Sequence, residues 1–130
     1  MRGLYGLLIV VGILIALTGC EDSSPDQSIV ITREHDGKTV TIKNGVDLDV
    51  VLSGNPTTGY QWVVAETESS VLPFVDSTYK PDSNEIGAGG TYTFHFKAMA
   101  SGAAHLRLVY KRLWEPVPIE TFSLTVRVNP

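Results

Sequence analysis

The chain has 130 residues, and its 10 lysines and arginines face 14 aspartates and glutamates, which gives a formal net charge of −4. A mildly acidic chain of this size argues against binding to nucleic acid or to anionic membrane surfaces, because both need clustered basic residues. Its one cysteine, Cys20, excludes an intrachain disulfide and a thiolate metal cluster.

The first 20 residues form an apolar leader. Arg2 precedes an apolar run from about Leu4 to Leu17, which is short for a membrane span but suits the core of a signal peptide. The run ends in Leu-Thr-Gly-Cys20, which resembles the lipobox of bacterial lipoproteins. The resemblance implies a signal peptide over residues 1–19, cleavage before Cys20 and lipid attached to Cys20. The alternatives are a secreted protein with a chance cysteine and a short amphipathic anchor.

A polar segment separates the leader from a single domain. Residues 20–28 contain Cys20 and the stretch EDSSPDQS, which is acidic, rich in serine and interrupted by proline, as in a flexible tether. Residues 29–130 have the size of one domain. Loss of the leader removes one basic residue, so the formal charge changes from −4 to −5. We expect the lipid to hold the domain at the bacterial cell envelope, facing the periplasm or the cell exterior.

From Ile29 onward, apolar and polar residues alternate with a period of two, which is typical of strands with one buried face. Asp36-Gly37 is the signal of a tight hairpin, and Asn44-Gly45 gives a second turn signal. The strands expected in this half of the domain cover residues 28–34, 39–43, 46–52 and 60–64. Val46, Leu48, Val50 and Leu52 share one face of the third strand, and Tyr60, Trp62 and Val64 mark the apolar positions of the fourth.

The second half of the domain is irregular at first and then alternates cleanly. One strand is expected over residues 71–79, inside the irregular region 66–90. Three later strands place their apolar residues on inward faces: Tyr92, Phe94 and Phe96; Ala104, Leu106, Leu108 and Tyr110; Phe122, Leu124, Val126 and Val128. No helical period appears after the leader. Seven or eight short strands with regular turn signals predict an all-β fold, an antiparallel immunoglobulin-like β-sandwich without a disulfide.

The residue types that catalysis needs are scattered along the chain. His95 and His105 lie on predicted outward faces, where we expect solvated imidazoles, and His35 is isolated. A zinc pair of His95 and His105 on neighbouring strands stays open, but no cysteine or near carboxylate completes a ligand set. An envelope enzyme would need both histidines to converge with a carboxylate such as Glu120. We therefore expect no catalytic residue, no metal and no cofactor.

The stretch Gly54–Trp62 (GNPTTGYQW) connects two expected strands and combines turn residues with two threonines. Pro56 fixes its own φ, and the side chain of Asn55 can bond the backbone that follows it. Gly59 can adopt a positive φ, which leaves the stiff side chains of Thr57 and Thr58 at the apex. A plain structural turn is one interpretation. The other is a rigid tip for binding, made of Asn55, Pro56, Thr57, Thr58, Gly59 and Tyr60.

Two further segments stand out. Gly87, Ala88, Gly89 and Gly90 leave the backbone bare, so its N–H and C=O groups are open to main-chain pairing with a partner. A flexible hairpin loop is the alternative for this segment.

The other segment, KRLWEP, contains Arg112, Leu113 and Trp114 in a charged loop that is limited by proline. Tryptophan and arginine are enriched at binding hot spots. A Trp114 that caps an edge or packs on a strand is the alternative.

Together, NPTTGYQW, GAGG and RLW resemble the motifs of the chagasin-type inhibitors of papain-like cysteine proteases. That family has an NPTTGY-type loop, a GxGG loop and an RPW-like loop on an immunoglobulin-like sandwich. The likeness spans roughly residues 29–130; Asn55–Tyr60 match the first motif without substitution, and the glycines of Gly87–Gly90 match the second. The third departs, because Leu113 stands where the family pattern has proline. That departure affects affinity or partner range, since a less fixed loop binds less tightly.

The resemblance implies a reversible, tight-binding inhibitor that inserts the three segments into a protease cleft. Thr57 and Thr58 would lie close to the catalytic Cys–His pair, and Gly87–Gly90 would bond along the non-primed side. Trp114 would cover the primed side, with Arg112 at the rim. The expected partners are papain-like cysteine proteases and, through the lipid on Cys20, a membrane, and we expect a monomer. The alternative is a lipid-anchored immunoglobulin-like module for envelope assembly or adhesion.

Overall fold

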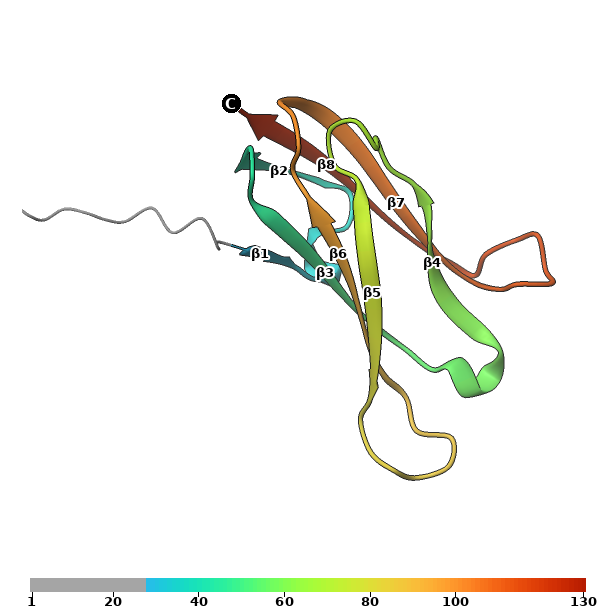
Figure 1. The fold of residues 1–130 in the computed structure, drawn as a ribbon. Coiled ribbons are helices and arrows are strands. Elements are labelled where there is room, and N and C mark those ends of the chain that lie inside the picture. Colours follow the sequence, from blue (N-terminus) through green and yellow to red (C-terminus); the bar gives the residue numbers. More distant parts are fainter. Residues whose placement is uncertain (1–27) are drawn as a thin grey trace, which may run out of the picture.

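The computed structural model describes residues 28–130 (Figure 1), and the leader, Cys20 and most of the expected tether lie outside this range. The described part contains no helix long and apolar enough to cross a membrane. Its elements, in chain order, are β1 (Ser28–Ile31), η2 (Arg33–His35), β2 (Lys38–Lys43), β3 (Asp47–Gly54), η3 (Pro56–Thr58), β4 (Tyr60–Glu66), β5 (Phe74–Pro81), β6 (Gly90–Lys97), β7 (Gly102–Arg112) and β8 (Glu120–Asn129).

The strands form two four-stranded sheets that pack face to face, which confirms the predicted sandwich (Figure 1). The first sheet has the order β1-β3-β6-β5, and the second has the order β2-β8-β7-β4. Most neighbouring strands run antiparallel, but β1 pairs with β3 and β2 pairs with β8 in parallel. The sandwich is therefore antiparallel in its centre and parallel along one side.

The hairpin predicted at Asp36-Gly37 is wrong, because the strands before and after it belong to different sheets. The turn itself is real, since Gly37 has a φ of 78°. It docks on β8, where the Gly37 N–H donates to the Ser123 carbonyl at 2.7 Å and Asp36 Oδ1 accepts from the Ser123 N–H at 2.9 Å. Asn44-Gly45 likewise joins a strand of one sheet to a strand of the other. Local turn chemistry predicts where the chain reverses but not which strand it meets.

Two expected strands have different limits. The strand expected over 28–34 ends at Ile31, where a short 3-10 turn begins. His35 Nδ1 accepts the Thr32 N–H at 3.1 Å and stabilises that turn. The strand expected over 71–79 is β5, which starts three residues later because Val71 and Leu72 still form a turn that bonds the Glu68 carbonyl. Alternation alone does not reveal these short turns.

The core lies between the two sheets and contains the residues that the alternation placed inward, together with Ile31, Ile42, Leu72 and Ala98. Phe96 and Phe122 are among its largest fully buried side chains. Truncation of a buried phenylalanine to alanine costs about 3–5 kcal/mol, so this core carries the stability of a domain without a disulfide. Buried residues of the predicted inward faces are Val46, Leu48, Val50, Leu52, Trp62, Tyr92, Phe94, Phe96, Ala104, Leu106, Leu108, Tyr110, Phe122, Leu124, Val126 and Val128.

Ionisation of Tyr92 should weaken the fold at high pH. Burial raises the pKa of the Tyr92 hydroxyl from 10.0 to about 12, and Tyr110 and Tyr79 add to the shift. The unfolded chain would ionise near pH 10. The contribution of the protonated Tyr92 hydroxyl to the free energy of unfolding is therefore fully present below about pH 10 and is lost as the pH rises towards 12. In thermal melts across this window, the melting temperature of Tyr92→Phe should fall less than that of the original chain, and equal falls would contradict the prediction.

Candidate functional site

The first loop, Asn55–Tyr60 (loop 1), is a tight 3-10 turn held by its own side chains. Asn55 Oδ1 accepts hydrogen bonds from the Thr57 N–H at 3.1 Å and the Thr57 hydroxyl at 2.6 Å. Pro56 begins the turn, and Gly59 ends it with a φ of 89° and an N–H that donates to the Pro56 carbonyl at 3.0 Å. These contacts confirm the turn chemistry predicted from the sequence.

The two apex threonines are exposed, yet both are held in place. The Thr58 hydroxyl donates to the Asn55 carbonyl at 2.8 Å, as the Thr57 hydroxyl does to the Asn55 side chain. The stiffness expected from β-branching is thus reinforced by hydrogen bonds, which sequence reasoning missed. A polar side chain two or three residues upstream was the signal that could have indicated them.

The second loop, Gly87–Gly90 (loop 2), lies against loop 1. The Gly87 carbonyl accepts from Asn55 Nδ2 at 3.0 Å, and Gly87 has a φ of 84°. A Cβ on Gly89 would lie 3.3 Å from the Gly54 carbonyl oxygen, so the two chains approach closely. Asn55 therefore connects the first two loops.

Gly90 differs from the open backbone that the sequence suggested. It is buried at the start of β6, opposite Gly54 on β3 and Pro81 on β5. A Cβ at this position would collide with the Lys80 carbonyl oxygen. Gly90 thus supports loop 2 from inside the sheet, and the exposed part of the loop is formed by the residues before it.

The third loop, Arg112–Trp114 (loop 3), begins at the end of β7 and lies on the other side of loop 1. Arg112 Nε donates to the Thr58 carbonyl at 3.2 Å, and its guanidinium stacks 4.4 Å from the Tyr60 ring centroid. The Glu115 N–H donates to the Arg112 carbonyl at 3.0 Å and closes the turn. Arg112 thus fixes loop 3 in the absence of the motif proline.

Trp114 is not a core or strand-packing residue, because 71% of its surface is exposed. One edge of its ring rests on loop 1, where a Cβ on Gly59 would lie 2.9 Å from Trp114 Cη2. Leu113 beside it is 64% exposed. The loop therefore presents an apolar surface next to the threonine apex.

The three loops gather at the end of the sandwich away from the C-terminus (Figure 1). Loop 1 occupies the middle, joined to loop 2 by the Asn55–Gly87 hydrogen bond and to loop 3 by the Arg112–Thr58 hydrogen bond. Apart from Gly90, which is buried in β6, every residue that the sequence singled out in these loops belongs to this edge, which we name the three-loop edge. Bare backbone, stiff threonines and an exposed tryptophan can together fill a groove in a partner.

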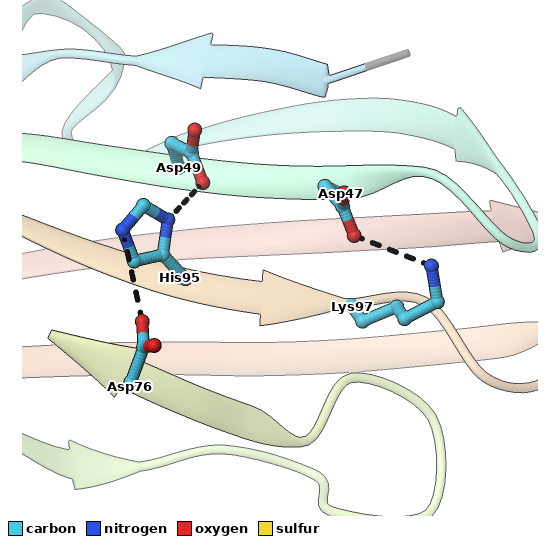
Figure 2. A network of polar contacts seen from close by, with 5 residues as sticks. All are labelled: Asp47, Asp49, Asp76, His95 and Lys97. Atoms are coloured by element: carbon cyan, nitrogen blue, oxygen red, sulfur yellow. Dashed lines mark hydrogen bonds and ion pairs between the residues drawn. The ribbon is translucent and has the colours of Figure 1, made fainter. Parts of the chain in front are cut away.

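His95 is less solvated than predicted, because it is held between two carboxylates on the outer face of the first sheet. Figure 2 shows its ring between Asp49 and Asp76, with Asp47 paired to Lys97 nearby. The distances are 2.6 Å from His95 Nδ1 to Asp49 Oδ1 and 3.7 Å from His95 Nε2 to Asp76 Oδ1. This network ties β3, β6 and β5 together side by side.

The zinc pair of His95 and His105 is wrong, because β6 and β7 belong to different sheets. His105 lies beside Thr125, and Glu120 pairs with Arg33 at 3.2 Å, so the three residues proposed for an envelope enzyme do not converge. Within residues 28–130, no group of three or more His, Cys, Asp or Glu side chains could hold a metal ion.

Comparisons with known proteins point to one family. The model of the chagasin family peptidase inhibitors (I42) matches residues 41–126. Amoebiasin-1 of Entamoeba histolytica is 36% identical over 102 residues, which cover 76% of this chain and 98% of that protein. Chagasin of Trypanosoma cruzi is 36% identical over 89 residues, covering 65% of this chain and 81% of chagasin.

Two solved structures share the fold. The cysteine protease inhibitor EhICP2 from Entamoeba histolytica has a TM-score of 0.73 at 22% identity, covering 82% of this chain and all of that one. PbICP-C, solved in complex with falcipain-2, has a TM-score of 0.56 at 20% identity, covering 85% of this chain and 96% of that one. At these identities the two structures establish the architecture alone.

Proposed function

The chain belongs to the chagasin family of peptidase inhibitors and is not an enzyme, and from this premise we propose that it inhibits papain-like cysteine proteases reversibly with its three-loop edge. One observation carries the proposal: two hydrogen bonds, Asn55 to Gly87 and Arg112 to Thr58, join all three loops into a single edge. Affinity depends on how much order binding must create. Because the three loops are already joined to one another, binding to a protease needs to order them little further.

Loop 1 enters the protease cleft and brings Thr57 and Thr58 close to the catalytic Cys–His pair. Their hydroxyls are already bonded to Asn55, so the apex keeps its shape on insertion. The inserted turn is compact, and it offers no extended peptide bond in the geometry that the catalytic thiolate attacks. The inhibitor therefore occupies the site without being cut.

Loops 2 and 3 bind on either side of the catalytic centre. Gly87 is exposed and Ala88 and Gly89 are half-buried, and this segment runs along the non-primed side. Its backbone groups that are not already bonded within residues 28–130, such as the Gly89 N–H and the Ala88 carbonyl, pair main chain to main chain with the protease. Trp114 and Leu113 cover the primed side, and exposed apolar surface of this kind marks interaction sites. Val117 and Ile119, which are 71% and 56% exposed, lie in the same connection between β7 and β8.

We also propose that lipid on Cys20 anchors the inhibitor at the bacterial cell envelope, facing the periplasm or the cell exterior. The Leu-Thr-Gly-Cys20 pattern after an apolar leader supports this proposal. Mass spectrometry of the chain isolated from membranes should find acyl groups on an N-terminal Cys20. A chain that still carries residues 1–19, or a mature Cys20 without lipid, would refute it.

The function is tested by measuring hydrolysis of a fluorogenic peptide by papain at increasing concentrations of the purified chain. We expect inhibition at micromolar concentration or below, competitive with the peptide, with the inhibitor recovered intact afterwards. Absence of inhibition against papain and against a panel of related proteases at micromolar concentration would refute the proposal. Cleavage of the Asn55–Tyr60 segment during inhibition would refute the mechanism.

A further inference from the structure

Tyr110 has a side chain that reaches from one sheet to the other at the three-loop edge. The residue lies on β7 in the second sheet, points into the sandwich and is 8% exposed. Its hydroxyl accepts the Asn55 N–H at 2.8 Å and lies 3.4 Å from the Asn55 carbonyl oxygen, to which it donates. One phenol thus engages both backbone groups of the residue that follows β3 in the first sheet.

The Tyr110 ring is fixed by its neighbours. It stacks on Tyr60 at 5.5 Å between centroids and packs against Trp62 at 5.1 Å. A Cβ on Gly54 would lie 3.1 Å from Tyr110 Cε1, so glycine makes room for the ring just before loop 1. Trp62 Nε1 donates to the Ser53 carbonyl at 2.9 Å and makes a second connection between the sheets. The phenol hydroxyl has little freedom to leave Asn55.

Tyr110 also lies at the base of the other two loops. Its carbonyl accepts the Ile119 N–H at 2.9 Å, and loop 3 begins two residues later, at Arg112. Asn55, which Tyr110 holds, donates in turn to the Gly87 carbonyl of loop 2. One side chain therefore relates the position of loop 1 to those of loops 2 and 3.

We infer that Tyr110 is a positioning residue for inhibition: its hydroxyl holds Asn55, and through Asn55 it sets the spacing of the three loops that the protease must accept together. The inference rests on the proposed function. Without the hydroxyl, the Asn55 N–H loses its partner and loop 1 samples other positions. Apparent affinity falls in proportion to the fraction of molecules whose loops are correctly spaced.

The test compares the full chain, solubilised in detergent, with its Tyr110→Phe and Tyr92→Phe variants. Tyr92 is the matched control, because it is as buried as Tyr110 in the same core and also lies beside Gly54. Among the hydrogen bonds of residues 28–130, Asn55 bonds the Tyr110 hydroxyl and not that of Tyr92. We expect Tyr110→Phe to raise the Ki for papain by about tenfold, the effect of losing roughly one hydrogen bond. Tyr92→Phe should leave the Ki within about twofold, and both variants should remain folded at the assay temperature, with melting temperatures no more than about 10 °C below that of the original chain.

A second measurement, amide hydrogen exchange at Asn55, reports on the positioning directly. The Asn55 amide should exchange slowly in the original chain and much faster in Tyr110→Phe, while amides of the central strands β6 and β7 stay protected in both. Fast exchange in the original chain would overturn the inference even if the variant failed to fold. An unchanged Ki in Tyr110→Phe, or equal losses in both variants, would also overturn it. If the original chain does not inhibit papain at all, the proposed function has failed instead.

Discussion

Thr58→Arg should raise the Ki for papain by about 100-fold or more, which equals about 2.7 kcal/mol of binding free energy. Thr58 is exposed at the apex of loop 1, the part of the edge that enters deepest in the proposed mechanism. An arginine there is too long for a narrow cleft, and it cannot replace the hydrogen bond from the Thr58 hydroxyl to the Asn55 carbonyl. The measurement is the Ki against papain with a peptide substrate.

Two variants control this experiment. Thr39→Arg adds the same charge and length at an exposed position on β2, on the opposite edge of the second sheet from β4, and should leave the Ki unchanged. Thr58→Ser keeps the hydroxyl and should stay within a few-fold of the original chain. A Thr58→Arg variant that inhibits as well as the original chain would mean that loop 1 does not enter the cleft.

Trp114→Ala should weaken binding by about 1–3 kcal/mol, or roughly 5- to 150-fold in Ki, because a large aromatic anchor is lost. The melting temperature should change little, since 71% of the side chain is exposed and only one ring edge rests on Gly59. Both quantities are measured on the same preparations, the Ki by inhibition of papain and the stability by thermal melting.

Met99→Ala is the control for the loss of exposed apolar surface. Met99 is 57% exposed and lies in the connection that follows β6, at the other end of that strand from loop 2. Its truncation should leave the Ki unchanged. If Trp114→Ala lost melting temperature and affinity in parallel, the tryptophan would be a structural cap; an unchanged Ki would remove loop 3 from the interface.

Alternation along the chain predicted the sandwich because each strand has one face in a shared core, and period two is a local property of the sequence. Its limits appear at Asp36-Gly37, where a correctly located turn leads to the other sheet. A turn signal describes a few residues, whereas the choice of partner strand depends on packing across the whole core. The parallel pairs β1–β3 and β2–β8 were missed for the same reason.

At the three-loop edge, local chemistry was predictable and long-range contacts were not. The hydrogen bond from the Thr57 N–H to Asn55 Oδ1 follows from the turn itself, and the positive φ of Gly59 was expected. The contacts that join the loops link residues that are separated in the chain by between 32 and 55 positions, and no local pattern encodes them. Tyr110 was predicted only as a core residue, because the alternation of apolar and polar residues in its strand is the same whether or not its hydroxyl bonds a loop.

Gly90 and Leu113 show how composition alone can mislead. Three glycines in four residues predict a bare backbone, but Gly90 is buried in β6 between β3 and β5, where the Lys80 carbonyl leaves no room for a side chain. Leu113 in place of proline predicts a loose loop 3, yet the hydrogen bond and stacking of Arg112 hold the loop from its first residue. In both cases the deciding contact comes from a distant segment.

The most direct test of the three-loop edge is to measure binding of the chain to papain whose cleft is open and to papain whose cleft is filled. In the filled form a peptidyl inhibitor alkylates the catalytic cysteine and occupies the substrate subsites. The open form should bind with the Ki found by inhibition, and the filled form should bind at least about 100-fold more weakly, because loop 1 has no space to enter. Equal affinity for the two forms would contradict insertion into the cleft.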